Sequence, residues 1–197
     1  MDSKRDEPHA AHLDFVGLTG PEVRAVMGAI ASGENFHGYI PETGLDFILR
    51  NYRQLATLGV LEAAWLDAYV HAPHFNQHGM LVVKAVFDAC DRDRLRLLKP
   101  ISAPYSSTDR LTLFRGCAGP VHTFGMSWSA SLDKAIWYAA HHVAFYDLAN
   151  PAVYVTTMSV ADIYCQLDHY DDDFIAYSEE AWRINLPASE FKLDRQR

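Results

Sequence analysis

The residues with the clearest chemical potential are an arginine and a serine on neighbouring segments of the chain. Arg115 follows the apolar run Leu111–Phe114 and precedes Gly116, and Ser129 follows a second short apolar segment. A guanidinium group is permanently charged and offers a planar fork of donors that matches phosphate oxygens. An arginine on one strand and a serine on the next, joined by a turn that contains glycine, therefore predict a crevice that binds a dinucleotide.

Two other groups of polar residues have the types of metal ligands but lack the pattern of a metal site. His71, His74 and His78 surround a turn, and no cysteine or carboxylate completes a ligand set nearby, which favours a polar loop. The acidic run Asp171–Asp173 lacks the other spaced oxygen ligands that a Ca²⁺ site requires. We therefore expect no bound metal.

The three cysteines, Cys90, Cys117 and Cys165, are an odd number at wide spacings. This usage indicates a reducing compartment rather than a disulfide framework. Cys117 and His122 have the types of a nucleophile and its base. Neither has a local signature or a third residue to orient the pair, so we do not expect them to form a catalytic site.

Composition and length set limits on the class of protein. The 197 residues are 49% hydrophobic, which is enough for one sizeable core, and length favours a single domain over residues 1–197. The formal charge of −8 disfavours non-specific binding of nucleic acid or of acidic membranes. From the sequence we expect no secretory leader and no segment that spans a bilayer, because we see neither a charged-then-apolar start nor an apolar run of the length required. We expect a cytoplasmic protein with no membrane partner.

Helical patterns fill the first half of the chain, over residues 19–97, after a flexible tail at residues 1–12. The first helix starts at the capping sequence that opens with Thr19 and contains Pro21 and Glu22, and it stops at Gly33. Apolar residues at helical spacing predict three more helices, over Gly44–Leu58, Leu61–Ala72 and Met80 to about Leu95.

Short strands dominate the second half, over residues 108–190. Ser131 is expected to cap one internal helix, which the Asn150–Pro151 pair ends, and Asp168–Tyr177 is expected to be an acidic loop. The order of elements predicts an α+β protein, with helices first and two small packed sheets after them. The expected strands are Leu111–Phe114, Phe124–Trp128, Ala152–Met158, Ile163–Leu167 and Ala181–Leu186.

The segments over Leu111–Leu186 resemble a known enzyme family. The sequences LFRG, then SWSAS followed by DKAIWYA, then EEAWRI occur in that order, each on the secondary structure it needs. This order is similar to the R-S-E class of mono-ADP-ribosyltransferases, a class that includes bacterial toxins, phage enzymes and vertebrate ecto-enzymes. The middle residue of the serine motif is Ala130, where the family has threonine. The resemblance implies a helical N-terminal half packed on a two-sheet, ADP-ribosyltransferase-like β core.

The resemblance also implies that NAD is the co-substrate and gives roles to individual residues. Arg115 would hold the NAD phosphates and the nicotinamide ribose, and Gly116 would let the bare backbone approach the carboxamide. Ser129 would position the ribose and the catalytic glutamate, and Ser131 matches the last serine of the motif. Tyr138 lies where family members often have an aromatic residue near the nicotinamide.

The resemblance leaves the position of the catalytic glutamate open among three registers. Glu180 is catalytic if Ser178 is the first position of the glutamate motif, and Glu179 is catalytic if Tyr177 is. In the third register Glu179 is the first position and Ala181 occupies the catalytic one, directly before the last strand. That register implies an inactive enzyme or a chain mutated to remove a toxic activity.

The family places target recognition in the loop before these glutamates. In this chain the corresponding contact residues are Tyr170, Phe174, Tyr177 and Ser178, and the acidity of the loop suits a basic target.

The resemblance implies a mono-ADP-ribosyltransferase that transfers ADP-ribose from NAD to a protein or a nucleic acid. Such enzymes are found as bacterial or phage toxins and effectors, which suggests delivery into a target cell and a cognate antitoxin or immunity protein as a partner. Two alternatives stay open. The same site is an NAD glycohydrolase if water is the acceptor, and the chain is a catalytically dead interaction module if Ala181 replaces the glutamate.

Overall fold

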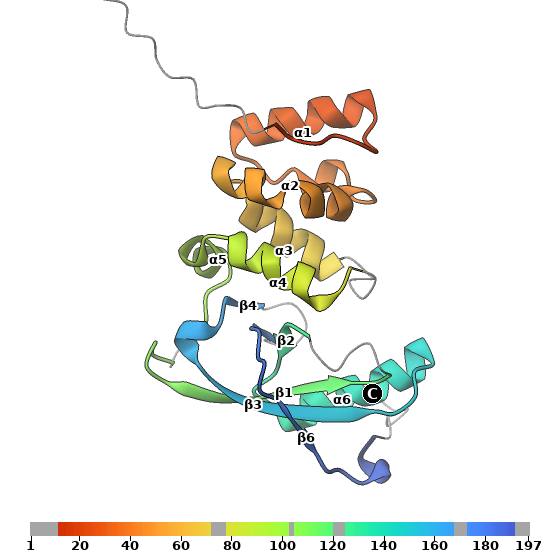
Figure 1. The fold of residues 1–197 in the computed structure, drawn as a ribbon. Helices are drawn as coiled ribbons and strands as arrows, with labels where there is room; N and C mark the ends of the chain where they lie inside the picture. The colour runs from red at the N-terminus through yellow and green to blue at the C-terminus, as the bar shows by residue number, and fades with distance from the viewer. Residues whose placement is uncertain (1–11, 72–77, 103–104, 120–124, 168–172, 192–197) are drawn as a thin grey trace, which may run out of the picture. The chain divides into compact units, whose positions relative to one another are not determined.

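The computed structural model describes residues 12–71, 78–102, 105–119, 125–167 and 173–191, and the expected tail therefore lies almost wholly outside the described residues. In these ranges the chain has six α-helices and two three-stranded antiparallel sheets, which confirms the predicted α+β class (Figure 1). None of the helices in these ranges has the length and apolarity needed to cross a bilayer. The chain divides into two compact units, Met1–Phe75 with Ala85–Asp91, and Asn76–Lys84 with Arg92–Arg197.

The first unit consists of helices that the sequence pattern predicts closely. Helix α1 is Gly20–Ser32, and it ends at Gly33 in the left-handed conformation with φ 69°. Glu22 accepts hydrogen bonds from the backbone N–H of Thr19 at 2.7 Å and from its hydroxyl at 2.6 Å, so the Glu22 half of the capping sequence forms. The other regular elements are the 3₁₀ helix η1 (His37–Tyr39), α2 (Gly44–Leu58) and α3 (Leu61–His71).

The single helix predicted from Met80 to about Leu95 is wrong. The chain forms α4 (Met80–Ala89) and α5 (Arg92–Leu98), with a break at Cys90 and Asp91. The backbone N–H of Asp91 donates to Glu62 Oε1 at 2.8 Å, and the Glu62 side chain is buried in α3. In a continuous helix the N–H of Asp91 would bond to a carbonyl of the helix itself. Because the helix breaks, this N–H is available to the buried carboxylate of Glu62.

The larger sheet of the second unit has the strand order β1-β3-β6. Its strands are β1 (Arg110–Cys117), β3 (Ala152–Ser159) and β6 (Trp182–Ile184), and both pairings are antiparallel. The register places Arg115 opposite Tyr154, and Tyr154 opposite Arg183. Because residues directly opposite each other point to the same face of a sheet, these three side chains form one row.

The smaller sheet has the strand order β2-β5-β4, and it corrects the predicted acidic loop. Its strands are β2 (Ser127–Trp128), β5 (Asp173–Ile175) and β4 (Cys165–Leu167). Strand β5 lies inside the segment predicted as loop. It pairs with both neighbours, and its central residue Phe174 is almost fully buried, so the burial of Phe174 and the two ladders outweigh the acidic composition.

The two faces of the larger sheet pack against different elements. On one face, Leu111, Leu113 and Met158 pack with Trp128 and Phe174 of the smaller sheet, and we call this set the inter-sheet cluster. The other face is covered by helix α6 (Leu132–Tyr146). The buried residues packed between α6 and this face are Ala135, Ala139 and Val153. The partly buried residues packed against them are Phe114, Leu132, Ile136, Ile184, Leu186 and Phe191. Two further 3₁₀ helices, η3 (Val160–Asp162) and η4 (Ala188–Phe191), complete the regular elements.

Candidate functional site

Arg115 lies near the end of β1, and its side chain points to the face that carries the inter-sheet cluster. Its Nη1 donates to the carbonyl of Ser127 at 2.8 Å. A Cβ atom placed on Gly125 would lie 1.9 Å from Arg115 Cζ, so the guanidinium group lies directly against the bare backbone of that glycine. Gly125 therefore fixes the position of the arginine by having no side chain. Sequence reasoning missed Gly125, because nothing in the local pattern connects it to a residue ten positions earlier.

Ser129 is brought next to β1, as the sequence predicts. It forms a pair of backbone hydrogen bonds with Phe114, at 2.7 and 2.8 Å, and its side chain is 4% exposed. Its hydroxyl accepts a hydrogen bond from the backbone N–H of Ser131 at 3.1 Å. Arg115 and Ser129 thus belong to adjoining segments at one end of β1, and the ligand-binding role of Ser129 stays a prediction.

Ser131 has the structural role that the sequence predicts. Its Oγ accepts from the backbone N–H of Lys134 at 3.3 Å and caps α6. Tyr138 is a half-buried residue of the same helix, with its ring 5.2 Å from that of Trp137. Because α6 covers the face of the sheet opposite to the Arg115 side chain, Tyr138 comes from the other layer of the unit.

Gly116 has a packing role that the sequence-based interpretation did not include. A Cβ atom at this position would lie 1.7 Å from the carbonyl oxygen of Ala135 and 2.8 Å from the backbone nitrogen of Ala139. Helix α6 therefore approaches β1 so closely that only glycine fits. Access of a ligand to the Gly116 backbone stays a prediction.

The segment with the candidate glutamates is fixed through its backbone. The hydroxyls of Thr156 and Ser178 both donate to the carbonyl of Glu180, at 2.7 and 2.8 Å. The side chains of Glu179 and Glu180 are exposed, whereas Ala181 packs against the inter-sheet cluster. Of the three positions, Ala181 is the one whose side chain packs against that cluster, and the choice of the catalytic position stays a prediction.

The predicted target-contact residues have different environments. Phe174 is 2% exposed and lies in the inter-sheet cluster, so it does not meet the expectation of a surface contact. Tyr177 is half-buried, and Lys84 Nζ lies 5.1 Å from the centre of its ring. Ser178 makes the backbone contact described above. Tyr170 lies outside the described residues.

Cys117 lies two residues after Arg115 on the same face of β1. Burial raises the pKa of its thiol, and the positive charges of Arg115 and Arg183 oppose this effect. Its Sγ donates to the Ala152 carbonyl at 3.7 Å. A raised pKa keeps the sulfur as the neutral thiol, which is a weak nucleophile. The proposed base, His122, lies outside the described residues.

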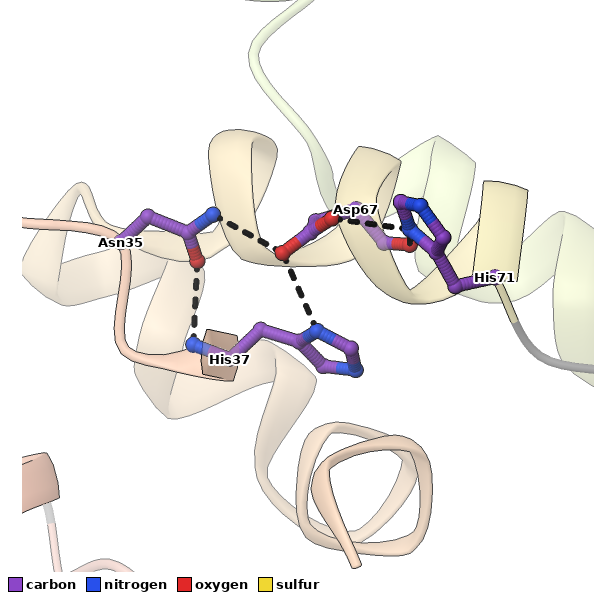
Figure 2. Close-up of polar contacts among 4 residues, drawn as sticks. All are labelled: Asn35, His37, Asp67 and His71. Atoms are coloured by element: carbon purple, nitrogen blue, oxygen red, sulfur yellow. Dashed lines mark hydrogen bonds and ion pairs between the residues drawn. The ribbon is translucent and has the colours of Figure 1, made fainter. Parts of the chain in front are cut away.

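The helical unit contains a polar cluster that sequence reasoning missed (Figure 2). Asp67 Oδ2 lies 3.1 Å from His37 Nδ1, and Asp67 Oδ1 lies 3.0 Å from His71 Nδ1. Asn35 Nδ2 donates to Asp67 Oδ2 at 3.2 Å, and Asn35 Oδ1 accepts from the His37 backbone at 3.0 Å. The signal for His71 was present, because Asp67 precedes it by one helical turn.

The contacts of this cluster indicate a structural role, because they connect Asn35 and His37 to Asp67 of α3. The ring of His37 is buried, and a Cβ atom on Gly44 would lie 2.6 Å from its Cδ2, so the far edge of the ring is closed by backbone. Within the described residues, no group of three histidine, cysteine, aspartate or glutamate residues has the geometry to hold a metal ion. Of the other predicted loop histidines, His74 lies outside those residues.

Comparisons with known proteins found no match: no family model, no curated protein and no solved structure matches this chain.

Proposed function

We propose that the chain binds NAD beside Arg115 and is a mono-ADP-ribosyltransferase. The observation that carries the proposal is the fixed position of the Arg115 guanidinium, held by the Ser127 carbonyl against Gly125, next to the segment that contains Ser129. A positioned guanidinium suits a phosphate-bearing substrate, because its rigid fork loses little freedom on binding. Among phosphate-bearing substrates we choose NAD, because the order of the motifs in the sequence resembles that of the mono-ADP-ribosyltransferases.

The proposed reaction breaks the bond between the nicotinamide nitrogen and C1′ of its ribose. The bonding electrons leave with nicotinamide, which becomes neutral, and the ribose passes through an oxocarbenium-like state. A nucleophile on the target then forms the new bond to C1′ and loses its proton to solvent. Arg115 and Ser129 would orient the substrate. A carboxylate near the ribose would stabilise the developing positive charge, and Glu180 and Glu179 are the candidates.

Transfer of label from NAD tests the proposal directly. Incubating the chain with labelled NAD and a host-cell extract should label macromolecules, and Arg115→Ala should abolish labelling. Arg110→Ala is the matched control, because Arg110 starts the same strand but bonds the Thr157 carbonyl instead. Absence of both labelling and nicotinamide release from the wild-type chain would contradict the proposal. Nicotinamide release without any labelled macromolecule would identify water as the acceptor.

Single substitutions then identify the carboxylate. Glu180→Gln should lower the rate of nicotinamide release at least about a hundredfold if Glu180 stabilises the transition state, and Glu179→Gln gives the same test for its neighbour. Gly125→Ala should weaken NAD binding while leaving the melting temperature nearly unchanged. The added Cβ overlaps the end of the Arg115 side chain, which is flexible and can move away.

A second candidate function, a non-catalytic binding module, is favoured by one observation. Ala181 packs against the inter-sheet cluster, and both neighbouring glutamates are exposed. In that case the wild-type chain binds NAD and leaves it intact. Ala181→Glu should then create nicotinamide release, with Ala181→Gln as the control of equal size. If Ala181→Glu has no effect and Glu180→Gln removes activity, the module hypothesis is wrong.

A further inference from the structure

A second arginine lies on the same row of the larger sheet as Arg115. The register pairs Arg115 with Tyr154 and Tyr154 with Arg183, so the two arginines are on one face with a tyrosine between them. Two strand spacings separate their Cα atoms by roughly 10 Å. An extended arginine side chain reaches more than half of that distance, so the two guanidinium groups can contact two linked anionic groups of one ligand.

The surroundings of Arg183 leave its guanidinium group available. The residue is exposed, and its Nη2 donates a hydrogen bond to the Pro151 carbonyl at 3.5 Å, the long limit for such a bond. No ion pair joins it to a carboxylate in the part of the chain that the structure describes. An exposed guanidinium group without a carboxylate partner can bind an anionic ligand, even in a chain of net charge −8.

The two arginines share a neighbour in the sheet. Cys117 lies in the next row of the sheet, and the charges of both Arg115 and Arg183 favour its thiolate form. Tyr154 packs against the inter-sheet cluster, which fixes the residue between the two cations. The Arg115 guanidinium group donates to the Ser127 carbonyl and lies against the backbone of Gly125. The result is one anchored and one adaptable guanidinium group, on the two outer strands of the three-stranded sheet.

We propose that Arg115 and Arg183 together bind a diphosphate, with one guanidinium group on each phosphate. Arg115 would hold the phosphate nearer the Ser129 segment, and Arg183 would hold the phosphate nearer the edge strand β6. Two forked donors separated by a tyrosine match two linked tetrahedral phosphates better than a single one. The identity of the ligand as NAD rests on the function proposed above, whereas the binding of a diphosphate does not.

Calorimetric titration with ADP-ribose, ADP, AMP and inorganic pyrophosphate tests this site. The wild-type chain should bind ADP-ribose and ADP clearly more tightly than AMP. Arg183→Gln should weaken ADP-ribose and pyrophosphate binding about ten- to a hundredfold, the range expected for losing a charged hydrogen bond, and should change AMP binding much less. Arg110→Gln is the matched control and should change none of these affinities. Arg183 is exposed, so the variant should keep the wild-type melting temperature.

Each outcome bears on the proposal in a defined way. Equal affinity of wild type and Arg183→Gln for ADP-ribose would overturn it, as would a wild-type chain that binds neither ADP-ribose nor pyrophosphate. An equal loss of AMP and ADP-ribose binding in Arg183→Gln would assign a single-phosphate site and would also overturn it. Tight diphosphate binding that depends on Arg183, without NAD turnover, would support this site and contradict the proposed transferase activity. The two proposals can therefore fail separately.

Discussion

Different kinds of contact determine the structure inside the helical unit and inside the sheet unit of this chain. In the helical unit, α1 and α2 end at residues that mark their own boundaries, Gly33 and Gly59. In the sheet unit, the decisive contacts join residues far apart in sequence, such as Gly116 with Ala135 of α6. The comparison teaches that short-range signals set the helix ends of the first unit, whereas close backbone approach determines the packing of the second. Substitutions in each unit test this difference.

The largest effect is expected from Gly116→Ala. The added methyl group overlaps the Ala135 carbonyl, and neither backbone can move without separating α6 from β1. We expect the free energy of unfolding of the sheet unit to fall by about 3 kcal/mol or more. Hydrogen exchange followed by mass spectrometry should show faster exchange in β1, β3 and α6, with α2 and α3 unchanged. Gly28→Ala in α1 is the control. No atom lies within 4 Å of its new Cβ, so it should be neutral or stabilising.

The second effect in size is expected from Asp67→Asn in the helical unit. The change removes the charge that the imidazoles of His37 and His71 share, and it leaves the buried His37 ring with a weaker partner. We expect a loss of about 1–3 kcal/mol, seen as faster exchange in α2 and α3 alone. His71→Ala should cost less, since that side chain is 62% exposed. A loss spread equally over both units would contradict the division into two units.

A smaller effect is expected from removing the side-chain caps of the two units. Ser131→Ala removes the hydroxyl that accepts from Lys134 and should cost about 1 kcal/mol, measured by denaturant unfolding. Thr19→Ala should cost less, because the Thr19 backbone N–H keeps its hydrogen bond to Glu22. A larger cost for Thr19→Ala would show that its hydroxyl caps α1 in solution.

The smallest effect concerns the pH dependence of α1. Hydrogen bonds from the Thr19 hydroxyl and backbone N–H lower the pKa of Glu22 from its ordinary value of 4.5. The unfolded chain therefore takes up this proton at a higher pH than the folded chain does. The stabilisation is present above pH 4.5 and is lost as the pH falls through the lowered value. Exchange at the start of α1 should increase on acidification in the wild type and change less in Glu22→Gln.

The same contrast explains what could be predicted from the sequence. The bounds of α1 and α2 follow from Thr19, Gly33 and Gly59, because caps act within a few residues. The break between α4 and α5 depends on Glu62, which is 29 residues from Asp91, so periodicity alone continues the helix. Strand β5 is three residues long and lies in an acidic stretch, and its burial depends on partners from two other strands.

The candidate site shows the same limit. The proximity of Arg115 and Ser129 was predictable, since each directly follows a short strand predicted from the sequence and a turn was expected between the two strands. The contact of Arg115 with Gly125 was not, because it depends on the path of the chain across the face of β1. The order of motifs also could not decide which of residues 179–181 faces inward. The side chain that packs against the inter-sheet cluster is that of Ala181. The sequence pattern allows three registers, and Ala181 is the catalytic position in one of them.

The close approach of α6 to Gly116 has a consequence for how such sequences evolve. A glycine required by packing stays under selection whether or not the protein still performs any reaction. A relative of this chain would keep the glycine after the arginine for as long as α6 packs on β1 in this way, whatever substitutions its candidate site carries. The presence of this glycine in a relative would therefore indicate the close packing of a helix on the strand and not an activity.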